Sequence, residues 1–75
     1  MRRVGTVVRT AQGLAIARSP AADHPDLGEP VVDEQLTDVG RVVDVMGPTA
    51  RPYVVIRPTA DRSPAALLDL TLYVR

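Results

Sequence analysis

Turn-forming residues divide this chain of 75 residues into short runs, and Val, Thr, Leu and Ile fill the runs between them. Short apolar runs at even spacing, bounded by Gly and Pro, are typical of small all-β proteins. The runs lie at residues 2–10, 14–19, 31–33, 39–46, 52–58 and 67–75. We therefore predict an all-β fold: about six strands in one domain, residues 1–75, closed into a small six-stranded β-barrel that leaves no strand edge exposed.

The last run predicts a strand that is buried on one face only. Leu68, Leu70, Leu72 and Val74 alternate with polar or amphipathic residues over this segment. Just before it, Ser63-Pro64 can begin a single helical turn, because Ser suits the N-cap position and Pro the first helical position.

The size of the chain raises the question of what stabilises it. A chain this short buries only about 60–65% of its extended surface, and small domains often rely on a disulfide, a metal or a partner. The absence of Cys excludes disulfides and Cys-based zinc sites, and the single His24 cannot form a His cluster.

Asp26 follows His24 in the Pro-rich segment 19–30, but no third ligand has a plausible spacing. We expect no metal and no cofactor, and we interpret both residues as solvated loop positions.

The N-terminal segment and the hydropathy of the chain bear on where the protein works. The opening MRRVGTVV carries two positive charges but lacks the apolar core of a signal peptide. No run approaches the ~20 apolar residues that cross a bilayer. We therefore expect a cytoplasmic protein that does not associate with membranes.

Residues 39–58 are unusual because both faces of their two predicted strands are largely apolar. Only one face of a strand can line the interior of a small barrel. Alternation along residues 39–46 groups Val43 with Val45 on one face. Along residues 53–57 it groups Tyr53 with Val55 on one face and Val54 with Ile56 on the other.

A contiguous exposed apolar patch usually marks an interaction surface. Gly47 can adopt a positive φ and Pro48 fixes its own φ, so the turn between the strands is stiff and loses little entropy on binding. The alternative is that loops of the same chain cover the second face. The predicted partner-binding residues are Val43, Val45, Met46, Gly47, Pro48, Pro52, Tyr53 and Val55.

The same segment resembles the Gar (glycine-arginine-rich) subunit family of H/ACA ribonucleoproteins, in its short archaeal form. The shared pattern is Val31-Val32-Asp33, Gly40-x-Val42-x-Asp44-Val45, Gly47-Pro48 and Pro52-Tyr53-Val54-x-Ile56. The opening VGTVV and the closing LYV agree more loosely, so the resemblance covers nearly the whole chain. Met46 stands where the family usually has Phe, and because Met is flexible it can fill the same kind of pocket.

The resemblance implies a six-stranded barrel similar to domains of translation elongation factors. It implies a non-catalytic accessory subunit that binds the catalytic domain of the pseudouridine synthase directly and modulates the loading and release of substrate RNA. Guide RNA and substrate RNA would then be reached only through the complex. The process would be rRNA pseudouridylation within ribosome biogenesis. Val54 and Ile56 would then point inward and fill the barrel. Val43, Val45, Tyr53 and Val55 would point outward and, with the other partner-binding residues named above, dock on the synthase.

An enzyme is one alternative. Ser19, Ser63 and His24 are present, but no nucleophile elbow, P-loop or HExxH motif accompanies them. Asp33, Asp44 and Asp69 could be imagined as paired carboxylates, yet each lies on a predicted strand or at its end, where a solvated face explains it. We therefore expect no independent catalysis.

A barrel that binds RNA directly is the second alternative. Arginines 2, 3, 9, 51, 57 and 75 could form a phosphate-binding stripe. Against this, nine Arg are balanced by nine acidic residues, and only two Tyr are available for stacking on bases. Dispersed arginines paired with neighbouring acids fit this balance better.

Overall fold

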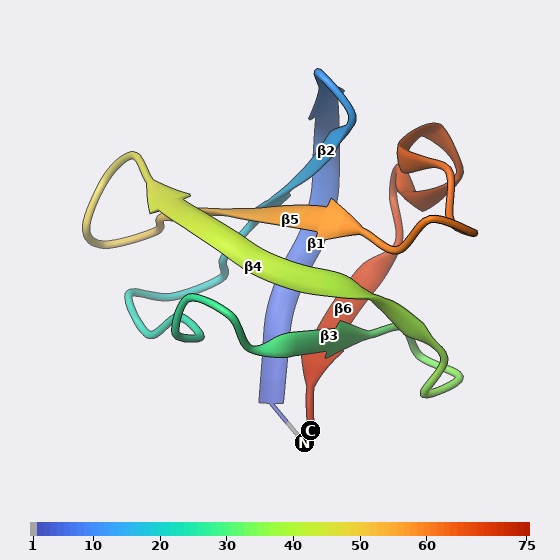
Figure 1. Ribbon diagram of the computed structural model, residues 1–75. Coiled ribbons are helices and arrows are strands. Elements are labelled where there is room, and N and C mark those ends of the chain that lie inside the picture. The colour runs from blue at the N-terminus through green and yellow to red at the C-terminus, as the bar shows by residue number, and fades with distance from the viewer. Residues whose placement is uncertain (1) are drawn as a thin grey trace.

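The computed structural model describes residues 2–75, and its strands close into an antiparallel barrel in the order β1-β2-β5-β4-β3-β6 (Figure 1). The strands are β1 (Arg2–Ala11), β2 (Leu14–Arg18), β3 (Pro30–Val32), β4 (Asp38–Met46), β5 (Tyr53–Pro58) and β6 (Thr71–Val74). A 3-10 helix, η1 (Pro64–Leu67), precedes β6. The predicted all-β fold and the closed six-stranded barrel are confirmed. No helix in this part of the chain is long and apolar enough to cross a membrane.

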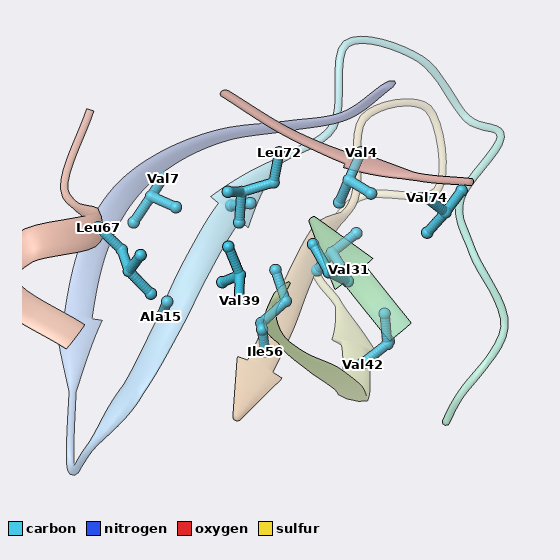
Figure 2. Close-up of a cluster of buried hydrophobic side chains, with 12 residues drawn as sticks. Val4, Val7, Ala15, Val31, Val39, Val42, Ile56, Leu67, Leu72 and Val74 are labelled. Atoms are coloured by element: carbon cyan, nitrogen blue, oxygen red, sulfur yellow. The ribbon is translucent and has the colours of Figure 1, made fainter. Parts of the chain in front are cut away.

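The interior of the barrel is filled by small aliphatic side chains from every strand (Figure 2). Valines predominate, and Ala15 and Ala17 of β2 leave room for the larger Ile56 and Leu72. Complete burial of one Val or Leu side chain stabilises a fold by about 1.5–3 kcal/mol. The core consists of Val4, Val7, Ala15, Ala17, Val31, Val39, Val42, Val54, Ile56, Leu67, Leu72 and Val74, with Val45 packed against it.

A β-bulge on β4 changes which residues face this core. The pairing with β5 shifts between Val42 and Asp44, so Val43 is an additional residue on the β4 side. A bulge of this kind breaks the two-residue alternation of a strand. Val45 therefore pairs with Val54 and packs against the core instead of sharing the outer face with Val43. The prediction that Val45 points outward is wrong for this reason.

The segment before β6 also differs from the predicted strand 67–75. Leu67 ends η1 and is fully buried, whereas Leu68 and Leu70 are exposed. Asp69 has φ +70°, which ends any extended backbone, and its N–H donates to the carbonyl of Val7 at 2.9 Å. The predicted helical turn at Ser63-Pro64 is present as η1, although the Ser63 side chain makes no capping hydrogen bond.

Gly40 lies where two strands approach closely. It pairs with Pro58, and a Cβ at this position would overlap the carbonyl oxygen of Arg57. Only glycine allows the β4 backbone to come this near to β5. The glycine of the Gly40-x-Val42 pattern is therefore required by the packing of the barrel wall.

Candidate docking surface

The turn of residues 47–52, between β4 and β5, projects from one side of the barrel, away from η1 (Figure 1). Gly47 has φ +88°, a conformation that residues with a side chain rarely adopt. A Cβ on Gly47 would lie 2.8 Å from Cδ2 of Tyr53, so the tyrosine ring packs directly against the turn. At the other end, Pro52 is buried and its carbonyl accepts a hydrogen bond from the Ser19 N–H at 2.9 Å. The turn is thus fixed at both ends, while Pro48 is exposed.

Tyr53 also contacts Arg18. The two residues are register partners on β5 and β2, and the guanidinium carbon lies 5.4 Å from the centroid of the ring. Nη1 of Arg18 also donates to the tyrosine hydroxyl at 3.3 Å. A cation–π contact at an exposed site contributes about 0.5–1 kcal/mol. The half-buried ring is therefore a fixed part of the surface.

The predicted partner-binding residues differ in how much of each side chain is exposed to solvent. Val43 and Met46 are 37% and 46% exposed. Val55 pairs with Ile16 and lies outside the core cluster, but it is only 5% exposed and offers little area to a partner. Pro52 is also buried, and Val45 is half-buried. The accessible set, called the docking surface below, is Val43, Met46, Gly47, Pro48 and Tyr53.

Beside this surface lies an open depression of about 380 Å³. The segment between β2 and β3 forms one wall of the depression through Ala22 and His24. At the start of this segment Ser19 is buried, and its Oγ donates to the carbonyl of Ala21 at 2.7 Å. Val45 is accessible through this depression despite its inward direction. The sequence did not reveal this wall, since residues far apart in the chain create it. The lining residues are Ala22, His24, Val45, Met46, Gly47, Thr49 and Pro52.

The residues considered for metal binding do not assemble into such a site. His24 Nδ1 lies 3.0 Å from the carbonyl oxygen of Pro25, and the Asp26 N–H donates to Glu29. Within residues 2–75 no three His, Asp or Glu side chains are close enough to hold an ion.

Asp33 holds the backbone of a loop and the side chain of an arginine. Its carboxylate accepts hydrogen bonds from the N–H groups of Gln35 (2.9 Å) and Thr37 (3.1 Å) and from Nη2 of Arg62 (3.1 Å). Burial raises the pKa of Asp33, but these hydrogen bonds and the charge of Arg62 outweigh burial, so the pKa lies below its usual value. Asp44 accepts a hydrogen bond from the Val45 N–H, and Asp69 is exposed. The carboxylates of Asp33 and Asp44 therefore stabilise the local backbone.

The six arginines considered as one RNA-binding stripe are spread over several places. Arg2 forms ion pairs with Asp23 (3.8 Å) and Glu29 (3.7 Å). Arg75 donates to the carbonyl of Leu36, and Arg51 lies in the turn of residues 47–52. Arg3 pairs with Tyr73 on β6, Arg9 with Ile16 on β2, and Arg57 with Arg41 on β4.

A model of the protein family described as the Gar1/Naf1 RNA binding region matches residues 1–74. The chain belongs to the Gar1 family. This Gar1-family chain is also 33% identical over 78 residues to a protein of Methanothermobacter thermautotrophicus described as uncharacterized. That match covers 99% of this chain and 83% of the relative. The family is a non-catalytic ribonucleoprotein family, which gives this Gar1-family protein an RNA-associated role.

Proposed function

We propose that this protein is an accessory subunit of the H/ACA guide-RNA pseudouridylation particle, working in the cytoplasm on rRNA. It binds the catalytic domain of the pseudouridine synthase through the docking surface and modulates how substrate RNA is loaded and released. The observation that supports this most strongly is the family match over residues 1–74, together with a fixed, partly apolar turn that nothing in residues 2–75 covers.

The physical case for a protein partner rests on the docking surface. Met46 and Val43 expose apolar area beside a turn whose backbone is fixed by Gly47 and by the buried Pro52. A surface that is ordered before binding loses little conformational entropy when the partner arrives. The adjacent depression can accept an apolar side chain of the partner, as interface anchors do.

The chemistry of uridine isomerisation belongs to the synthase in this proposal. The carboxylates of Asp33 and Asp44 hold backbone N–H groups, and Asp33 also holds Arg62. In this proposal the accessory subunit positions mobile parts of the synthase against substrate RNA.

Co-purification of the full chain with the synthase of the same organism tests the proposal. The complex should survive ribonuclease treatment, because the contact is between proteins. Substrate turnover by the reconstituted particle should change when this subunit is left out. Loss of the complex after ribonuclease treatment would contradict direct docking, and unchanged turnover would contradict the modulating role.

A further inference from the structure

Three exposed leucines lie on the η1 side of the barrel. Leu36, Leu68 and Leu70 are each between 36% and 47% exposed. Leu36 belongs to the loop between β3 and β4, and the other two follow η1 on the way to β6. Both segments lie on the side of the barrel away from the turn of residues 47–52 (Figure 1). A group of exposed apolar side chains is typical of an interaction surface.

An open depression of about 360 Å³ lies between the two segments. Leu70 and Thr71 line it from the β6 side, and the residues that follow β3 line it from the other. A partner that reaches this side therefore meets an apolar side chain and the carboxylate of Glu34 in one depression. The lining residues are Asp33, Glu34, Gln35, Arg62, Leu70 and Thr71.

Hydrogen bonds fix the backbone at two of these leucines. The Leu70 carbonyl accepts the Val7 N–H of β1 at 2.9 Å. Leu36 has φ +63°, which bulky residues rarely adopt. Its N–H donates to the Asp33 carbonyl at 3.0 Å, and its carbonyl accepts Nη2 of Arg75 at 3.0 Å. Residues held in such conformations cluster at binding sites, and a fixed surface loses little entropy on binding.

The ionisable residues of this side have an excess of negative charge. One arginine is neutralised, because Nη2 of Arg62 lies 3.1 Å from the Asp33 carboxylate. On the neighbouring wall Arg57 is opposite Arg41 in the ladder, so neither of these arginines is opposite an acid. The ionisable residues of this side are Asp33, Glu34, Asp38, Asp61, Asp69, Arg62 and Arg75.

The unpaired acids decide which kind of partner this side accepts. Glu34, Asp38 and Asp69 are exposed and form no ion pair in the part of the chain that the structure describes. They repel phosphate groups and attract lysine and arginine side chains. The leucines add apolar contacts that a purely electrostatic partner would leave unused.

We propose that Glu34, Leu36, Asp38, Leu68 and Leu70, called the η1 surface below, bind a basic segment of a second protein partner. In this segment Arg or Lys side chains stand beside an apolar side chain. The apolar side chain packs on Leu70 in the depression, and the cations pair with Glu34 and Asp38. Because the docking surface lies on the other side of the barrel, the segment and the synthase bind at the same time, and the inference does not depend on synthase docking (Figure 1).

Nuclear magnetic resonance of the ¹⁵N-labelled full chain, titrated with a short synthetic peptide of Arg, Leu and Ser, tests the η1 surface. Chemical shift changes should be confined to residues 33–38 and 62–71. The same peptide with Glu in place of Arg should cause none. Leu70→Ala should weaken binding at low and at high salt, because its contact is apolar.

Glu34→Gln/Asp38→Asn should weaken peptide binding at least about threefold at low salt, since two exposed ion pairs are lost. The matched control is Asp26→Asn/Asp44→Asn, which removes the same charge from exposed acids elsewhere and should change binding much less. The Asn at position 44 keeps the oxygen that accepts the Val45 N–H. The dispersion of the amide spectra shows that both double variants fold.

Equal effects of the two double variants, shift changes at the docking surface only, or no binding of the basic peptide would overturn the proposal. Shift changes at the η1 surface that depend on protein concentration without peptide would overturn it in favour of a second copy of the chain. Changes there on addition of single-stranded RNA would overturn it in favour of nucleic acid. Weaker synthase binding by Glu34→Gln/Asp38→Asn would contradict a separate partner.

Discussion

Arg18 and Tyr53 are stacked across β2 and β5, with the guanidinium carbon 5.4 Å from the centroid of the ring. An edge atom of the same ring, Cδ2, lies 2.8 Å from the position that a Cβ on Gly47 would take. The ring therefore links the turn of residues 47–52 to Arg18 on the barrel wall, in addition to the hydrogen bond between Pro52 and Ser19.

Gly47→Ala should disturb this arrangement. Alanine at a positive φ costs roughly 1–2 kcal/mol, and at Gly47 (φ +88°) its Cβ would also meet Cδ2 of Tyr53 at 2.8 Å. Gly13→Ala is the matched control, because Gly13 has φ +80° but nothing within 4 Å of a Cβ. Thermal unfolding should show a larger loss for Gly47→Ala, and only this variant should weaken binding to the synthase. Equal losses for both variants would mean that the ring does not support the turn.

Val43 and Val55 should respond differently to a negative charge. Val43 is 37% exposed, so Val43→Glu should leave the barrel folded and weaken synthase binding at least about tenfold. Val55 is 5% exposed, so Val55→Glu buries a charge and should destabilise the fold by several kcal/mol. Melting curves combined with calorimetric titration of the synthase separate the two effects. A stable Val55→Glu protein that has lost binding would instead place Val55 in the interface.

Substitutions at the neighbours Leu67 and Leu68 test whether η1 packs into the barrel core and closes it. Leu67 is completely buried, and Leu67→Ala should cost about 2–5 kcal/mol. Leu68 is 45% exposed, and Leu68→Ala should change stability by less than about 0.5 kcal/mol. Urea unfolding measures both. A large cost at Leu68 and a small one at Leu67 would restore the simple alternation predicted from the sequence.

These examples show what alternation could and could not predict. The strands and the closed barrel followed from runs of apolar residues between turns. The inward direction of Val54 and Ile56 was predicted with the resemblance to the family, because both faces of their strand are apolar. The direction of Val45 did not, because the bulge at Val43 adds one residue without any local signal in a stretch of valines. Leu68 lies outside the barrel because the positive φ of Asp69 ends the extended backbone.

The docking surface remains a proposal, and the sequence predicted the five accessible residues that form it. These residues, named from the apolar faces, the turn and the family pattern, are Val43, Met46, Gly47, Pro48 and Tyr53. The wall formed by Ala22 and His24 comes from a distant segment and could be located only in the folded chain.

Asp33→Asn should make stability depend differently on pH. The folded-state pKa of Asp33 lies below its unfolded value of about 3.9, so its charge stabilises the fold above that value, and this stabilisation is lost as the pH falls through the lowered pKa. At pH 7 the variant should be less stable by about 1–2 kcal/mol, because the charged hydrogen bond with Arg62 is lost. In unfolding curves measured from neutral to acidic pH, the stabilities of the variant and the wild type should converge only as the pH falls through the lowered pKa of Asp33.

Asp44→Asn is the control for this pH series. The Asn side chain keeps the oxygen that accepts the Val45 N–H, and no arginine pairs with Asp44 within residues 2–75. At pH 7 its stability should differ little from that of the wild type. An Asp33→Asn difference that persists unchanged at low pH would show that packing, and not charge, accounts for the loss.

The most direct test of the docking surface is the affinity of the ribonuclease-treated synthase for Met46→Glu and Leu68→Glu, measured by calorimetry. These side chains are 46% and 45% exposed, so both substitutions add one negative charge to a comparable surface position. Met46 ends β4 beside the turn of residues 47–52, whereas Leu68 directly follows η1, which lies on the other side of the barrel (Figure 1). Docking through the turn predicts that Met46→Glu raises the dissociation constant at least about tenfold while Leu68→Glu leaves it unchanged. Normal binding by a folded Met46→Glu protein would contradict the proposed surface.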